Sequence, residues 1–153
     1  ERIKAKVNAS SVRDGAINKA VHQDDYRANP SICLTQSVDP ATGRYTGALG
    51  RWAGARWMDG TSNFTGVTMI VGPNKPSCTS PNDSDQYDGV MDPSSQHTGG
   101  VHALMGDGAV RFISDNIDTG DITAPVVAGS AQSPYGVWGA LGSVKGNETV
   151  GEF

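Results

Sequence analysis

The sequence predicts an α+β domain that is mainly antiparallel β, with one N-terminal helix and long loops. Apolar and polar residues alternate on both sides of the turn at residues 106–108, which indicates a β-hairpin. The chain contains 20 glycines and 8 prolines in 153 residues, a content typical of short strands joined by tight turns. This length is sufficient for a single domain, residues 1–153, with a hydrophobic core.

The N-terminal region predicts a strand followed by a helix. In residues 1–7, the apolar side chains Ile3, Ala5 and Val7 alternate with basic ones. We therefore expect residues 1–10 to form an edge strand or a strand donated to a neighbouring subunit. Ser11 is a candidate N-cap for a helix over about residues 12–21, which Gly15 weakens.

The middle of the chain predicts strands separated by loops. Polar residues over 24–30 indicate a loop, and a strand is expected within residues 51–58. The apolar run over residues 65–71 predicts a buried strand. Residues 73–93 are rich in proline and aspartate and predict a long loop, and residues 137–141 predict a short helix or packed turn.

The hairpin carries the most specific pattern in the chain. Glycine supplies the positive φ that a tight turn needs, and aspartate bonds to its own backbone there. We expect His97 and Asp107 to approach each other at one end of the hairpin. Two interpretations follow: a His–Asp pair in a binding or metal site, with His102 as a further ligand, or a histidine that locks the loop.

His97, Asp107 and Gly108 form a His-x9-Asp-Gly motif. This motif resembles the C-terminal signature of DUF1559, a large bacterial family of pilin-like secreted proteins of unknown function. Other similar segments are residues 11–18, 57–60, 76–78, 135–142 and 148–153, so the resemblance covers essentially the whole chain. Full-length family members begin with a prepilin-type leader and a long apolar helix, which this sequence does not include. The resemblance implies a pilin-like globular head, in which a sheet packs on a helix, and an extracellular or cell-surface location in bacteria.

The two cysteines, Cys33 and Cys78, do not form a Cys-x-x-Cys pair, which argues against a zinc or redox site. In a secreted chain they are expected to form a disulfide, and the alternative is two buried free thiols. Closing a loop of some 45 residues would stabilise the fold by about 4 kcal/mol, because the disulfide lowers the conformational entropy of the unfolded chain. A disulfide would also indicate an oxidising compartment.

Composition argues against several classes of function. The net charge is −4, and the 12 lysines and arginines form no basic run, which argues against nucleic-acid binding. No apolar run approaches the roughly 18 residues that a membrane span requires. The sequence lacks a nucleophile elbow, a His-Glu-x-x-His helix and a phosphate-binding loop, so we expect no enzymatic activity and no catalytic residues.

Acidic and asparagine residues provide weaker candidate sites. Candidate metal ligands are Asp83, Asp85, Asp88, Asp115 and Asp118. Calcium is the candidate ion because it prefers oxygen ligands, and a solvated acidic loop is the alternative. Sequons for glycosylation begin at Asn8, Asn63, Asn82 and Asn147.

Two functions fit these observations. The first is a structural subunit of an extracellular filament or pilus-like appendage, which assembles with copies of itself through strand and apolar contacts. The second is a carbohydrate- or solute-binding module, because aromatic rings stack on sugars. Its candidate residues are Tyr45, Trp52, Trp57, Tyr87 and Tyr135.

Overall fold

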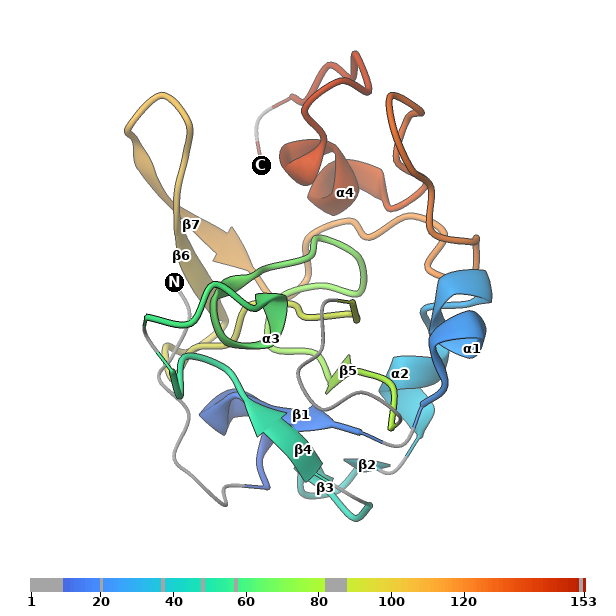
Figure 1. The fold of residues 1–153 in the computed structure, drawn as a ribbon. Helices are drawn as coiled ribbons and strands as arrows, with labels where there is room; N and C mark the ends of the chain where they lie inside the picture. The colour runs from blue at the N-terminus through green and yellow to red at the C-terminus, as the bar shows by residue number, and fades with distance from the viewer. Residues whose placement is uncertain are drawn as a thin grey trace.

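The structure, a computed structural model, describes residues 10–19, 21–36, 38–47, 49–56, 58–81, 88–151 and 153. The helical elements are η1 (Val12–Asp14), α1 (Gln23–Ala28), α2 (Ile32–Thr35), α3 (Ser62–Thr65) and α4 (Gly136–Gly142). The strands are β1 (Ala16–Asn18), β2 (Val38–Asp39), β3 (Arg44–Tyr45), β4 (Leu49–Trp52), β5 (Ser77–Cys78), β6 (Gly100–Leu104) and β7 (Val110–Ser114). These elements make an α+β fold of short helices and mainly antiparallel sheets (Figure 1).

The short strand β1 lies at the centre of the main sheet, whose order is β4-β1-β5. It pairs antiparallel with β4 and parallel with β5, and all of its residues are buried. Gly15, with φ 73°, ends the preceding 3-10 turn and leads the chain into the strand. The helix expected over residues 12–21 is therefore wrong, because this segment is held by strand partners from distant parts of the chain.

The first α-helix of the described chain is α1, within the segment that was expected to be a polar loop. Its N-cap is His22, whose Nδ1 accepts a hydrogen bond from the Asp24 amide at 3.4 Å. Tyr26 is the buried residue of this helix and packs into the main core. A single apolar anchor of this kind gives little periodicity, which is why the sequence pattern did not reveal the helix.

The strand expected over residues 65–71 is also wrong. The helix α3 ends at Thr65, and the following residues make no regular strand. The backbone amides of Ile70, Val71 and Gly72 instead donate hydrogen bonds to the side chain of Asp92. A buried segment needs partners for its amides, and here a carboxylate replaces a neighbouring strand.

Other expectations hold in part or in full. Within the region expected to contain a strand, β4 begins at Leu49 and ends at Trp52, earlier than residues 51–58. The expected hairpin is confirmed as β6 and β7, and the expected C-terminal helix is confirmed as α4. In the described part of the chain, no helix has the length and apolar character that a membrane span requires.

Among the described residues, buried apolar side chains gather in three clusters. The largest contains Val21, Tyr26, Cys33, Ile70, Val71, Cys78, Val90 and Tyr135. A second contains Val12, Ala16 and Tyr45, and the third contains Val101, Ile113 and Trp138. The third cluster joins the hairpin to α4, and it supports the surface described next.

Candidate interaction surface

The β6–β7 hairpin projects from the body of the molecule, with its turn at the far end (Figure 1). Its register runs from Gly100 opposite Ser114 at the base to Leu104 opposite Val110 near the turn. Because side chains alternate between the faces of a strand, one face carries Val101 and the other carries Leu104. The two faces therefore have different environments, which the burial of their side chains shows.

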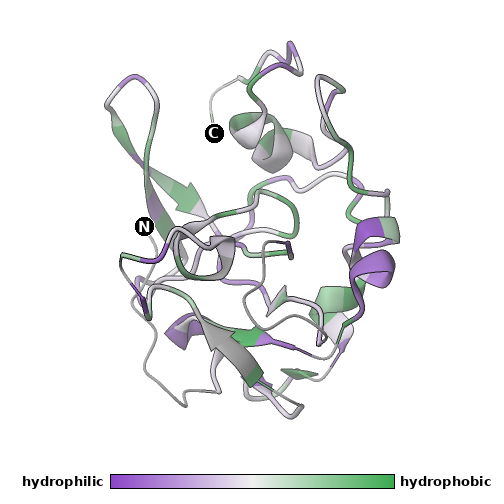
Figure 2. Cartoon of the chain, in the orientation of Figure 1, coloured by the Kyte–Doolittle hydropathy of each residue, from purple (hydrophilic) through white to green (hydrophobic). Residues whose placement is uncertain are grey.

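One face of the hairpin is buried and the other is open. Val101 and Ile113 are buried against Trp138. On the opposite face, Leu104, Val110 and Phe112 have exposed fractions of 74%, 66% and 46%. We call these three residues the hairpin face; parts of both strands are correspondingly green in Figure 2. These three large apolar side chains, exposed together on one small sheet, form a candidate interaction surface.

Asp107 and Gly108 form the turn of this hairpin. The Asp107 carboxylate accepts a hydrogen bond from the Ala109 amide at 2.9 Å, and Gly108 has φ 85°. His97 precedes the base of β6, so the register places it at the opposite end of the hairpin from Asp107. The predicted approach of His97 to Asp107 is therefore wrong: the two residues of the motif mark the two ends of one hairpin.

A row of rings runs from the base of the hairpin toward its open face. The His97 and His102 rings make an edge contact with centroids 5.1 Å apart, and His102 makes a similar contact with Phe112 at 5.2 Å. His102 and Phe112 are direct cross-strand partners, a position at which ring pairs stabilise a sheet. His97 thus takes part in ring packing at the base of the hairpin.

Arg13 holds both ends of the hairpin base. Its guanidinium donates to the carbonyl oxygens of Ser95 and His97, at 2.9 and 3.1 Å, before β6 begins. It also forms an ion pair with Asp115, at 2.9 Å, directly after β7 ends. The planar guanidinium can make these contacts together because its donors point in several fixed directions.

Asn74 completes this network from another loop. Its side-chain nitrogen donates to Asp115 at 2.6 Å, and its side-chain oxygen accepts from the Ser95 amide at 2.7 Å. Its backbone has φ 57°, a conformation that asparagine adopts more readily than most residues. Neither Arg13 nor Asn74 was predicted from the sequence, because each acts on residues far away in the chain.

Below the hairpin, Asp92 is a buried carboxylate surrounded by donors. Besides the amides of residues 70–72, it accepts the indole N–H of Trp138 at 2.7 Å and contacts the Thr68 hydroxyl at 3.4 Å. Burial raises the pKa of Asp92 to about 6, against the lowering effect of the Trp138 and backbone hydrogen bonds. The carboxylate therefore joins residues 68–72 to α4, and through Trp138 it reaches the buried side of the hairpin.

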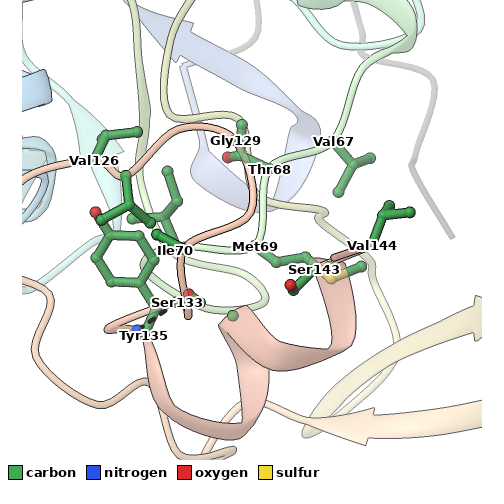
Figure 3. A pocket seen from close by; sticks show the side chains of 14 residues that line it. Val67, Thr68, Met69, Ile70, Val126, Gly129, Ser133, Tyr135, Ser143 and Val144 are labelled. Carbon is green, nitrogen blue, oxygen red and sulfur yellow. Dashed lines mark hydrogen bonds between the residues drawn. The ribbon is translucent and has the colours of Figure 1, made fainter. Parts of the chain in front are cut away.

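A groove opens on the other side of α4 (Figure 3). It has a volume of about 470 Å³. Val67 and Val144 lie on one side of it, and Val126 and Tyr135 lie on the other. Gly139 and Gly142 of α4 also line it. Of the described residues that line the groove, none carries an acidic or basic side chain.

The acidic residues predicted as metal ligands are dispersed, as far as the structure describes them. Asp88 pairs with Arg27, and Asp115 pairs with Arg13. Asp118 accepts hydrogen bonds from backbone amides at Gly120 and Val137. Asp83 and Asp85 lie outside the described residues. Within the described ranges, no three histidine, cysteine or acidic side chains come together as metal ligands do.

The predicted disulfide is confirmed: Cys33 and Cys78 are bonded, with 45 residues of sequence separation. The bond joins α2 to β5 in the largest core cluster. Among the candidate sugar-binding aromatics, Tyr45 and Tyr135 are buried, and burial raises the pKa of both phenols. Tyr45 is therefore a core residue that presents no open face to a sugar, and Tyr135 is largely buried at the side of the groove.

Several predicted positions fall outside what the structure describes. These are the assembly strand residues Ile3, Ala5 and Val7, the sequons at Asn8 and Asn82, and the aromatics Trp57 and Tyr87. Asn63 lies in α3, and Asn147 is exposed with φ 57°. The exposed aromatic ring of the hairpin, Phe112, was not among the predicted binding residues, although its place in the alternating pattern could have indicated it.

Comparison with known proteins adds a family assignment. A family model described as "Protein of unknown function (DUF1559)" matches residues 2–120, which include the hairpin and both cysteines. No curated protein and no solved structure matches the chain. The matched range covers most of the sequence, in agreement with the His-x9-Asp-Gly motif that the hairpin carries. The chain is a member of the DUF1559 family.

Proposed function

We propose that this protein is a structural subunit of an extracellular or cell-surface filament, and that copies associate through the hairpin face. The observation that carries the proposal is the combination of exposed apolar side chains at Leu104, Val110 and Phe112 on a projecting sheet. Burying apolar surface contributes about 25 cal/mol for each Å² removed from water. Such a surface is suited to a partner that covers it.

The backbone of the hairpin supports the same proposal. The sheet has two strands in the described part of the chain, so the outer edge of each strand has no neighbour in the β6–β7 ladder there. Open strand edges are positions at which a further strand can add by backbone hydrogen bonds. Residues 1–10, the predicted donated strand, are a candidate for this addition between copies.

The rigid base of the hairpin suits a role in assembly. Arg13 and Asn74 hold the base through charged and amide hydrogen bonds, while the far end projects from the body. A contact element fixed in this way loses little conformational freedom on binding, which favours association. The disulfide is consistent with an oxidising, extracellular location. A pilin-like head and location at a bacterial surface remain part of this proposal.

The test is the association state of the whole chain as its concentration is raised. We expect sedimentation to show growing species and electron microscopy to show filaments. A tip variant, Leu104→Asp with Val110→Lys, should remain monomeric because both charged groups would lose hydration in the contact. Both positions are exposed, and the two new charges are opposite in sign across the strands, so its circular dichroism and melting temperature should match those of the unmodified chain. A chain that stays monomeric at millimolar concentration would contradict the proposal.

A further inference from the structure

The chain carries an apolar projection and an apolar groove at separate places. The projection is the pair Leu104 and Val110, which are cross-strand partners beside the hairpin turn. Partner side chains of this kind lie about 5 Å apart and present a single apolar knob. The groove is the one lined by residues 67–70, 126–133 and α4.

We infer that the hairpin tip of one copy inserts into the groove of a second copy. This inference rests on the proposed function and names the acceptor for the hairpin. The groove is large enough for a few aliphatic side chains, and its described lining contains no acidic or basic group. An uncharged groove of this kind suits aliphatic side chains, because no buried charge is left without a partner on binding.

Apolar side chains at the rim of the groove are themselves open to solvent. Val67, Val126 and Val127 are about half exposed, and Val144 is 93% exposed. Each of them would lose water contact when an apolar knob enters. The groove and the knob therefore both gain from the same contact, which is the usual basis of association through apolar surfaces.

One pair of charges beside the two surfaces is complementary. Asp107 is exposed at the hairpin turn, next to the knob in sequence and space. Lys145 is exposed beside Val144 at the rim of the groove. When the knob enters, Asp107 approaches Lys145, and opposite charges at the edge of an interface favour the correct orientation.

The geometry also determines the kind of assembly. The helix α4 lies between the two surfaces, because Trp138 and Leu141 pack toward the hairpin while Gly139 and Gly142 line the groove. A contact between two different surfaces of one chain is heterologous, so each new copy presents a free knob and a free groove. Repetition of such a contact gives a filament or a ring instead of a closed dimer.

The experiment uses two complementary variants of the full chain. The tip variant defined above has an intact groove, and a groove variant, Val127→Asp with Val144→Asp, has an intact tip. Alone, each should associate at least about 100-fold more weakly than the unmodified chain, the size expected for loss of an interface hot spot. Mixed in equal amounts, they should form dimers that do not extend, because only one intact contact is available.

A control variant and a charge variant sharpen the result. Met58→Asp changes an exposed apolar residue outside both surfaces and should assemble like the unmodified chain. Lys145→Glu should weaken association at low salt and have less effect at high salt, because ions screen exposed charges.

The possible outcomes separate the two proposals. If the unmodified chain forms filaments and the groove variant does so equally well, the groove is not the acceptor, and the proposed function stands. If the mixture of tip and groove variants stays monomeric, the inference also fails. If the unmodified chain itself never associates, both proposals fail.

Discussion

At the scale of single residues, Asp92 joins two separate segments of the chain below the hairpin. A buried carboxylate is costly unless donors surround it, and here the donors come from residues 68–72 and from Trp138. Since its donors belong to two separate segments, the Asp92 side chain fixes the position of α4 against residues 68–72.

The titration of Asp92 gives a test with a defined sign. Its pKa in the folded protein is about 6, above the ordinary 3.8, so the folded state binds a proton more readily than the unfolded chain. The Asp92 contribution to the free energy of unfolding therefore increases as the pH falls from about 7 to about 4. Two pKa units correspond to about 3 kcal/mol.

The measurement compares the chain with its Asp92→Asn variant by denaturant unfolding at several pH values. We expect the difference in free energy of unfolding to shift in favour of the aspartate as the pH falls. Asp59→Asn is the matched control, because hydrogen bonds from Thr61 lower the pKa of Asp59. Its difference should shift in the opposite direction. A difference for Asp92→Asn that is constant with pH would show that this carboxylate does not titrate as stated.

At the scale of elements, substitutions on the buried and the open face of the hairpin should have different effects on stability. Ile113→Ala removes a buried side chain next to Trp138 and should lower the free energy of unfolding by about 3 kcal/mol. Gly100→Ala should also destabilise the fold, because a Cβ atom there would lie 2.1 Å from the Ile113 carbonyl oxygen. Leu104→Ala, on the open face, should change stability by less than about 0.5 kcal/mol. Equal effects of Ile113→Ala and Leu104→Ala in urea unfolding would contradict this assignment of the faces.

The sequence predicted elements whose contacts are local. The hairpin follows from the alternation and from the Asp107-Gly108 turn. The residues that pair between its two strands lie at most about fifteen positions apart, a range over which sequence patterns are informative. The strand β1 has partners in β4 and β5, which come from distant parts of the chain. Its short sequence fits a helix equally well, so only the tertiary contacts select the strand.

The same reason explains which parts of the candidate surface were missed. The alternation predicted the two strands of the hairpin, but it could not show which of its faces would stay open. Arg13 contacts residues more than 80 positions away, and no sequence periodicity reports such a contact. Asp107 and Gly108 lie at the predicted turn, whereas His97 precedes β6, and its distance from Asp107 depended on the register.

At the scale of the whole molecule, a covalent bond connects distant segments in addition to the sheets. The bond between Cys33 and Cys78 closes a loop that includes β2, β3, β4 and α3. Any single cut in the backbone inside this loop leaves both products attached through sulfur. In the extracellular location that we propose, the chain would meet proteases, and a cut in this loop would not release either part.

Limited proteolysis can measure this consequence directly. A protease that cuts once between residues 38 and 65 should yield one band of full mass on a gel without reductant and two bands after reduction. Two bands without reductant would contradict the connection. The backbone can thus be cut anywhere in a loop that makes up nearly a third of the chain, and the protein remains one molecule. Proteolysis in this loop would therefore not release subunits from the assembly that we propose.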